Sequence, residues 1–104
     1  MAGSRDQTGG AVQERVRTRQ QTPRQYNVLL LNDDYSTMDF VILVLEQVFQ
    51  KTPAEAYGIM MQVHLNGRGL AGVYTQEIAE TKVDTVATMA REAGYPLRAI
   101  MEEA

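Results

Sequence analysis

The chain has 104 residues, of which 44% are hydrophobic, and this fits one small globular domain. No cysteine is present, which excludes a disulfide scaffold, a thiolate metal site and a cysteine nucleophile. The net charge of −3 divides into +3 on residues 1–24 and −6 on the other 80 residues. Phosphate contacts need clustered basic side chains, so the net negative charge of residues 25–104 argues against nucleic-acid binding.

The sequence contains no candidate for a membrane span. Its longest apolar run, from Phe40 to Leu45, has six residues, whereas a transmembrane helix needs roughly 20. The N-terminus also lacks the apolar stretch of a secretory signal peptide. We therefore expect a cytoplasmic protein that makes no membrane contact.

Residues 1–22 are expected to form a disordered arm, because they combine glycine, glutamine, threonine and arginine without an apolar period. The ordered part is expected to begin near Pro23, with a largely buried strand over 25–31. Ser36, followed three residues later by Asp39, resembles a helix N-cap with an acidic partner. Apolar residues then recur at the helical period and predict a helix over 37–50.

The clearest local signal is at Thr52, Pro53 and Glu55, which are typical of the N-cap, N1 and N3 positions of a helix. This second helix is expected to end at Asn66 and Gly67. A short apolar strand is predicted over 70–74. A third helix, capped by Thr75, is expected to end at Gly94, and a last strand over 97–102 follows Pro96.

The order strand, helix, helix, strand, helix, strand predicts how the chain folds back on itself. The short link at Lys51 and Thr52 makes the first two helices antiparallel, so the second helix returns to the end of the first strand. The second and third strands then both run antiparallel to the first. We predict a two-layer α+β fold, with the first strand in the middle of a three-stranded antiparallel sheet and the three helices on one face.

One end of this fold collects side chains suited to a ligand. Asn32, Asp33 and Asp34 follow the first strand, and His64, in the last turn of the second helix, arrives beside them. Apolar residues gather at the same end: Met38, Val41, Met60 and Leu97. Oxygen acceptors and an imidazole beside apolar side chains suit a cation attached to an apolar group, and the C-terminal dipole of the helix favours an ammonium.

Four short segments occur in a fixed order along the chain: VLLLNDDY at 28–35, MMQVH at 60–64, GVYT at 72–75 and AETKV at 79–83. Together they resemble the ClpS family of N-degron adaptors over about residues 24–104. Thr37 departs from this pattern, since many members have proline before the methionine that follows. In residues 1–22 we recognise no feature of the family.

The resemblance implies a ClpS-like α/β sandwich over 23–104, without enzymatic activity or a cofactor. It implies an adaptor that binds proteins whose N-terminal residue is bulky and hydrophobic (Leu, Phe, Tyr or Trp). A monomer of this adaptor would deliver them to a Clp AAA+ ATPase of the ClpA or ClpC type, with ClpP, for degradation.

The resemblance also implies roles for individual residues. Asn32, Asp33 and His64 would bind the α-amino group, with Asp34 and Ser36 nearby. Six apolar residues would form the side-chain pocket, with Met38 as its gate: Leu30, Met38, Val41, Met60, Val63 and Leu97. Glu77 and Lys82 would dock on the ATPase.

Three other functions compete with this interpretation. Asp33, Asp34 and His64 could hold a divalent ion in a metal-dependent hydrolase, although there is no second histidine. An acidic pair after an apolar strand also resembles the corner of a phosphorylated receiver domain, but that fold needs about five parallel strands. Serine or threonine nucleophilic catalysis lacks a supporting elbow motif.

Overall fold

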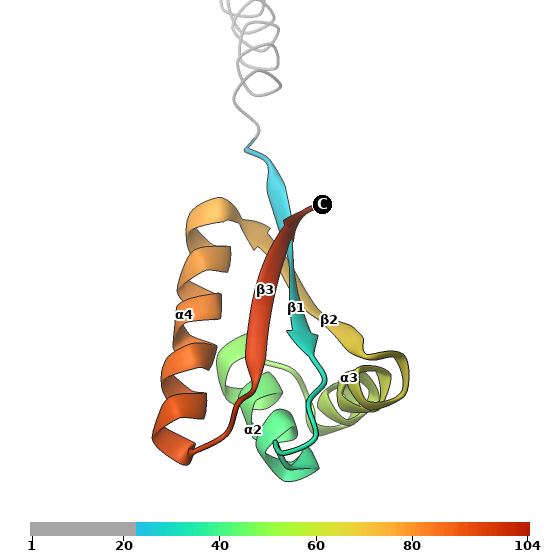
Figure 1. Cartoon of the computed structure of the whole chain (residues 1–104). Coiled ribbons are helices and arrows are strands. Elements are labelled where there is room, and N and C mark those ends of the chain that lie inside the picture. Colours follow the sequence, from blue (N-terminus) through green and yellow to red (C-terminus); the bar gives the residue numbers. More distant parts are fainter. Residues whose placement is uncertain (1–22) are drawn as a thin grey trace, which may run out of the picture.

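The computed structural model describes residues 23–104, in which three helices pack on a three-stranded sheet (Figure 1). The elements are β1 (Gln25–Leu31), α2 (Met38–Phe49), α3 (Pro53–Asn66), β2 (Arg68–Thr75), α4 (Gln76–Ala93) and β3 (Arg98–Glu103). Their predicted order is confirmed, although β2 is longer than the predicted 70–74 and β3 begins one residue later than predicted. The arm predicted for 1–22 lies outside the described residues.

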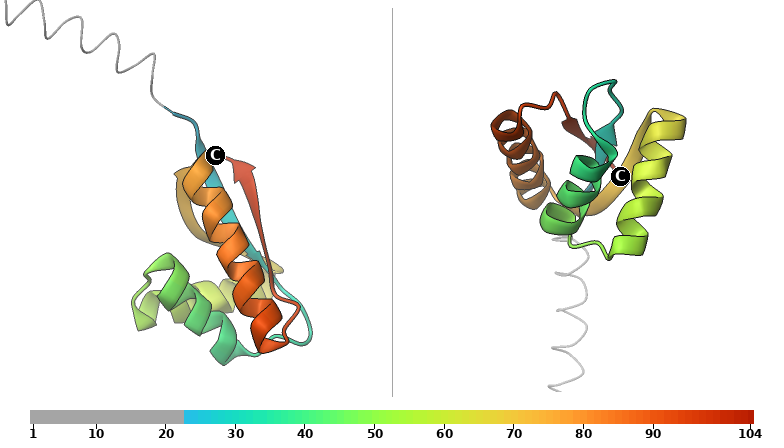
Figure 2. Two further views of the ribbon diagram at one scale, coloured as in Figure 1. Left: turned by 90° about the vertical axis from the view of Figure 1, so that its left-hand side faces the viewer. Right: turned by 90° about the horizontal axis from the view of Figure 1, so that it is seen from below.

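β1 lies between β2 and β3 and is antiparallel to both, as predicted. The three helices lie along one face of this sheet (Figure 2). Val28 and Leu30 of β1 are fully buried in the core, together with Val44 and Leu45 of α2. The two-layer α+β fold is therefore confirmed, with β1 as the central strand of the sheet.

The start of α2 differs from the prediction. Its N-cap is Thr37, whose side-chain oxygen accepts a hydrogen bond from the backbone N–H of Phe40 at 3.1 Å. Ser36 was expected in this position and is not the cap, because its hydroxyl group donates to Asp33 instead, at 2.8 Å. The helix therefore starts one residue later than predicted, and Ser36 belongs to the loop after β1.

The start of α3 agrees with the prediction in detail. Thr52 accepts from the backbone N–H of Glu55 at 3.2 Å, and the Glu55 carboxylate accepts from the backbone N–H of Thr52 at 2.9 Å. This capping box fixes the turn between α2 and α3, and so makes the two helices a hairpin. The last turn of α3 is thereby brought back to the end of β1.

At the start of α4, Thr75 takes the predicted N-cap position, but its side chain makes no capping hydrogen bond. Among residues 23–104, none of the helices has the length and apolar character required to cross a membrane.

Candidate functional site

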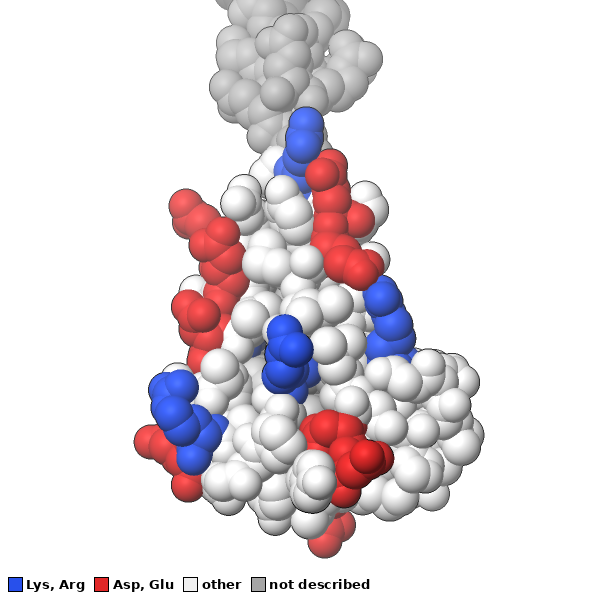
Figure 3. All heavy atoms as spheres, viewed as in Figure 1, with Lys and Arg blue, Asp and Glu red and all other residues white. Residues whose placement is uncertain are grey.

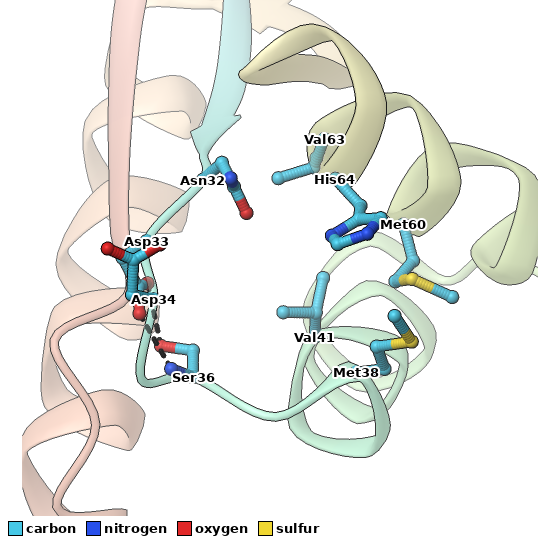
Figure 4. Close-up of a pocket in the computed structure, with 9 residues that line it drawn as sticks. All are labelled: Asn32, Asp33, Asp34, Ser36, Met38, Val41, Met60, Val63 and His64. Carbon is cyan, nitrogen blue, oxygen red and sulfur yellow. Dashed lines mark hydrogen bonds between the residues drawn. The ribbon is translucent and has the colours of Figure 1, made fainter.

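A pocket of about 240 Å³ lies between the loop after β1 and the helices α2 and α3. It is smaller than the roughly 300–1,000 Å³ of pockets for drug-sized ligands, which suits a single residue. Figure 4 shows its polar loop facing the apolar side chains of the two helices. All nine lining residues are ones that the sequence singled out: Asn32, Asp33, Asp34, Ser36, Met38, Val41, Met60, Val63 and His64.

Asn32 and His64 project toward one another across this pocket (Figure 4). Their positions are fixed by the backbone: the N–H of Asn32 donates to the carbonyl of Gly67 at 2.9 Å. Gly67 ends α3 with a φ of 88°, which favours glycine, and its own N–H donates to the carbonyl of Val63. The end of β1 is thus hydrogen-bonded to the end of α3, which carries His64 one turn earlier.

A close approach of α3 to β2 supports the same arrangement. A Cβ atom added to Gly69 would lie 2.8 Å from Cγ2 of Val63 and 3.1 Å from the carbonyl oxygen of Ile59. Only a residue without a side chain allows the helix to lie this near the strand. Gly69 therefore sets the position of α3 against the sheet and, with it, the positions of Met60 and His64.

Asp33 holds the loop in shape. Its carboxylate accepts three hydrogen bonds, from the N–H of Tyr35 at 2.8 Å, the N–H of Ser36 at 2.6 Å and the hydroxyl of Ser36 at 2.8 Å. Partial burial raises the pKa of Asp33, but these donated hydrogen bonds outweigh that effect and the pKa is lowered overall. The carboxylate is therefore ionised at neutral pH and adds negative charge to the polar wall.

The apolar wall is formed by side chains that are almost fully buried. Met60 and Val63 of α3 are each 3% exposed and Val41 of α2 is 6% exposed. Met38 differs, because it is 48% exposed and stands at the first position of α2. It therefore lies at the rim of the pocket, while the other three lie deeper.

Two further residues expected in the pocket are placed elsewhere. Leu30 and Leu97 are 0% and 3% exposed and belong to the main hydrophobic core, and neither lines the cavity. Leu30 precedes the loop by two residues, and Leu97 comes directly before β3, which contributes no lining residue.

The two residues expected to dock on an ATPase, Glu77 and Lys82, line a second depression, between α2 and α4. Lys82 is bound within the chain: its ammonium donates to the carbonyl of Val48 at 2.5 Å and to Oε1 of Gln50 at 3.2 Å. It also lies over the ring of Tyr74, 5.5 Å from the centroid. Lys82 thus places a positive charge at the C-terminal end of α2.

The rest of this α2–α4 groove was not predicted from the sequence. The other lining residues are Gln47, Val48, Gln50, Ile78, Thr81, Thr85 and Met89. Ile78 is an apolar side chain that is 49% exposed. Acidic side chains run along the exposed side of α4 (Figure 3), where Glu77, Glu80 and Asp84 lie. The apolar Ile78 beside Glu77 was the feature of the sequence that could have indicated this groove.

A metal centre is not supported for the part of the chain that the structure describes. Within residues 23–104, His, Asp and Glu side chains form no group of three that could hold a metal ion. Asp33, Asp34 and His64 line one pocket without forming such a cluster. The described sheet is also antiparallel, unlike the parallel sheet of a receiver domain.

Comparisons with known proteins agree with this fold. The family model of the ATP-dependent Clp protease adaptor protein ClpS matches residues 21–100. The ClpS adapter of Ralstonia nicotianae is 52% identical over 95 residues, covering 91% of this chain and 88% of that protein. The ClpS adapter of Wolinella succinogenes is 57% identical over 81 residues, covering 78% and 79%.

A solved structure shows the same architecture. Agrobacterium tumefaciens ClpS2 bound to L-phenylalaninamide superposes with a TM-score of 0.76 and 38% sequence identity, over 79% of this chain and 99% of that one. Both the sequence and the fold are therefore shared with adaptors. This chain belongs to the ClpS family, which consists of adaptors of Clp proteases and not of enzymes.

Proposed function

We propose that the pocket binds the first residue of a polypeptide whose N-terminal side chain is bulky and hydrophobic: Leu, Phe, Tyr or Trp. The observation that supports this most directly is the pairing of Asn32 and His64 across a cavity whose other wall is apolar (Figure 4). An α-amino group needs acceptors, and a large apolar side chain needs a buried wall. The cavity offers both, and its volume of about 240 Å³ suits a single residue.

The structural relative supports the same proposal. L-phenylalaninamide, the ligand of Agrobacterium ClpS2, carries a free α-amino group and an aromatic side chain, with an amide in place of the carboxylate. It therefore imitates the first residue of a polypeptide rather than a free amino acid. The same chemistry fits the polar and apolar walls of this pocket.

Within the pocket, we assign the contacts with the amine to the side-chain carbonyl of Asn32, the carboxylate of Asp33 and a ring nitrogen of His64. The Asp33 carboxylate already accepts from Tyr35 and Ser36, which fixes the loop, and it adds negative charge and retains capacity to accept a further hydrogen bond. Charge-assisted hydrogen bonds are each worth about 1.5–3 kcal/mol. Val41, Met60 and Val63 would surround the side chain, with Met38 at the entrance.

The test is a set of peptides that differ only in the first residue. Peptides that begin with Leu, Phe, Tyr or Trp are expected to bind at least about tenfold tighter than those that begin with Ser or Gly, because burial of a large apolar side chain is worth about 1.5–3 kcal/mol. Affinity that is indifferent to the first residue would overturn the proposal.

We further propose that the α2–α4 groove docks on a Clp ATPase of the ClpA or ClpC type, with ClpP as the protease, and that one adaptor monomer carries one substrate. The support is an exposed apolar side chain, Ile78, next to Glu77 in a groove separate from the pocket. Lys82 shapes this groove, because its ammonium joins α4 to the end of α2.

Delivery can be tested in a reconstituted degradation assay. Charge reversal at Glu77 should reduce ATPase binding and substrate degradation, while the affinity for peptides stays unchanged because the pocket lies on other residues. Unchanged degradation by this variant would remove Glu77 from the docking surface. Deletion of residues 1–22 tests the arm in the same assay, with loss of delivery but not of peptide binding as the expected result.

A further inference from the structure

The helix α3 carries apolar side chains on two sides. Ala56, Met60 and Val63 face the core, whereas Tyr57 is 56% exposed and Leu65 is 71% exposed. Met61 lies between these two and is partly buried. We call Tyr57, Met61 and Leu65 the α3 strip. Single exposed apolar residues are common, but two exposed ones in one row of a helix, joined by the partly buried Met61, indicate a contact surface.

The α3 strip lies directly beside the pocket. Its residues are four positions apart and so form one row of the helix, about 12 Å long at 1.5 Å per residue. Met60 and His64, which line the pocket, form the neighbouring row, about 80° away around the helix at 100° per residue. A chain that leaves the pocket over His64 therefore meets the strip at once.

The opposite rim is the loop from Asn32 to Ser36, which offers a single exposed aromatic side chain, Tyr35, at 78% exposure. The other side chains of this loop are polar, and the ionised carboxylate of Asp33 adds negative charge to it. Over α3, an apolar chain would instead meet two exposed apolar side chains in one row, Tyr57 and Leu65.

We propose that the α3 strip binds the residues that follow the N-terminal residue of a bound polypeptide, and that it selects apolar ones. This inference rests on the proposed function of the pocket. An extended chain advances about 3.3 Å per residue, so a strip about 12 Å long accommodates about four residues. The strip thus provides a second specificity site for positions two to five of the polypeptide.

The test uses three probes: L-phenylalaninamide, a peptide with Phe first and Leu or Val at positions two to five, and a peptide with Phe first and Gly or Ser at those positions. The wild-type chain should bind the apolar peptide about fivefold tighter than the polar one, because only the former buries additional apolar area. In Tyr57→Ser and in Leu65→Ser, the ratio of the affinities for the apolar and the polar peptide should fall to about half its wild-type value or less. The affinity for L-phenylalaninamide should stay unchanged.

Leu43→Ser is the matched control. Leu43 is also an exposed leucine on a helix, 42% exposed on α2, and it does not line the pocket. For Leu43→Ser, the ratio of the affinities for the apolar and the polar peptide should equal that of the wild-type chain. Since all three side chains are exposed, the variants are expected to fold, and thermal unfolding checks this.

Each other outcome has a defined meaning. Equal affinity of the wild-type chain for both peptides, or a ratio that both strip variants leave intact, would overturn the inference while the pocket proposal stands. Failure of L-phenylalaninamide to bind the wild-type chain would overturn the pocket proposal, and the inference with it. Strip variants that weaken only ATPase binding, or only self-association, would assign the strip to those partners and would also overturn the inference.

Discussion

The backbone N–H of Asn32 donates to the carbonyl of Gly67 at 2.9 Å, and this hydrogen bond joins the end of the central strand to the end of α3. The two residues are far apart in the sequence, yet their contact determines that the Asn32 side chain and His64 share one pocket. The position of this pocket is therefore set by backbone hydrogen bonds as well as by its side chains.

Two glycines of this region should respond to alanine in opposite directions. At Gly58, inside α3, an added Cβ meets nothing within 4 Å, so Gly58→Ala should raise the free energy of unfolding by about 0.5–1 kcal/mol. At Gly69 the added Cβ would overlap Val63, and Gly69→Ala should lower it by about 1–3 kcal/mol. Urea denaturation measures both, and a stabilised Gly69→Ala would refute the close packing of α3 on β2.

Replacement of Asp33 should destabilise the fold in a pH-dependent way. Its pKa is lowered in the folded state, so its contribution to stability is present above the unfolded-state pKa and is lost as the pH falls through the folded-state pKa. Asp33→Asn should therefore lower the free energy of unfolding by about 1 kcal/mol at neutral pH, a loss similar to that of a helix cap, and this cost should shrink as the pH falls below the unfolded-state pKa of about 3.9. The control is Asp34→Asn, which removes none of the Asp33 hydrogen bonds, and an equal cost from both variants would contradict the assignment.

Lys82 should contribute to stability as well as to docking. Lys82→Met removes the hydrogen bonds to Val48 and Gln50 and the contact with Tyr74. We expect a loss of about 1–2 kcal/mol in the free energy of unfolding. Lys51→Met, at the other lysine of the described residues, serves as the control and should change it by less than about 0.5 kcal/mol. No loss in Lys82→Met would show that its contacts are not structural.

Met38 should control which side chains enter the pocket. A β-branched residue carries its bulk next to the backbone, where the exposed Met38 narrows the entrance. Peptides that begin with Leu should therefore bind better than those that begin with Ile, and Met38→Ala should reduce this difference to about threefold or less. Competition binding with the two peptides measures it, and an unchanged ratio would show that Met38 is not the gate.

His64 should supply an acceptor to the amine. His64→Ala removes this acceptor, so a peptide that begins with Phe should bind at least about tenfold more weakly. His64→Gln keeps an acceptor oxygen and should lose less affinity. Equal affinities of the wild-type chain and of His64→Ala for this peptide would exclude His64 from the amine contact.

Most of the fold was predictable because each element carries local signals. The box formed by Thr52 and Glu55, and the glycines at 67 and 94, mark helix ends through backbone chemistry that acts over three or four residues. Ser36 was misassigned because the competing acceptor, Asp33, lies in the same loop, and two neighbouring hydroxyl residues offer the same cap. Only the folded loop decides between Ser36 and Thr37.

The candidate site was predictable where the topology alone brings residues together, as it does for Asn32 and His64. Leu30 and Leu97 were expected on its wall but do not line the cavity, because an apolar pattern does not distinguish a residue that lines a pocket from one buried elsewhere in the same core. The contact between Lys82 and Val48 joins residues 34 positions apart, and no local pattern encodes it. The α2–α4 groove therefore required the structure.

The central claim is that the pocket recognises a free α-amino group beside a bulky side chain. The most direct test is calorimetric titration with two peptides of the same sequence that begin with Phe, one free and one acetylated at its N-terminus. Acetylation removes the charge and its hydrogen bonds, so we expect at least about a tenfold loss of affinity. Equal affinities for the free and the acetylated peptide would contradict the claim.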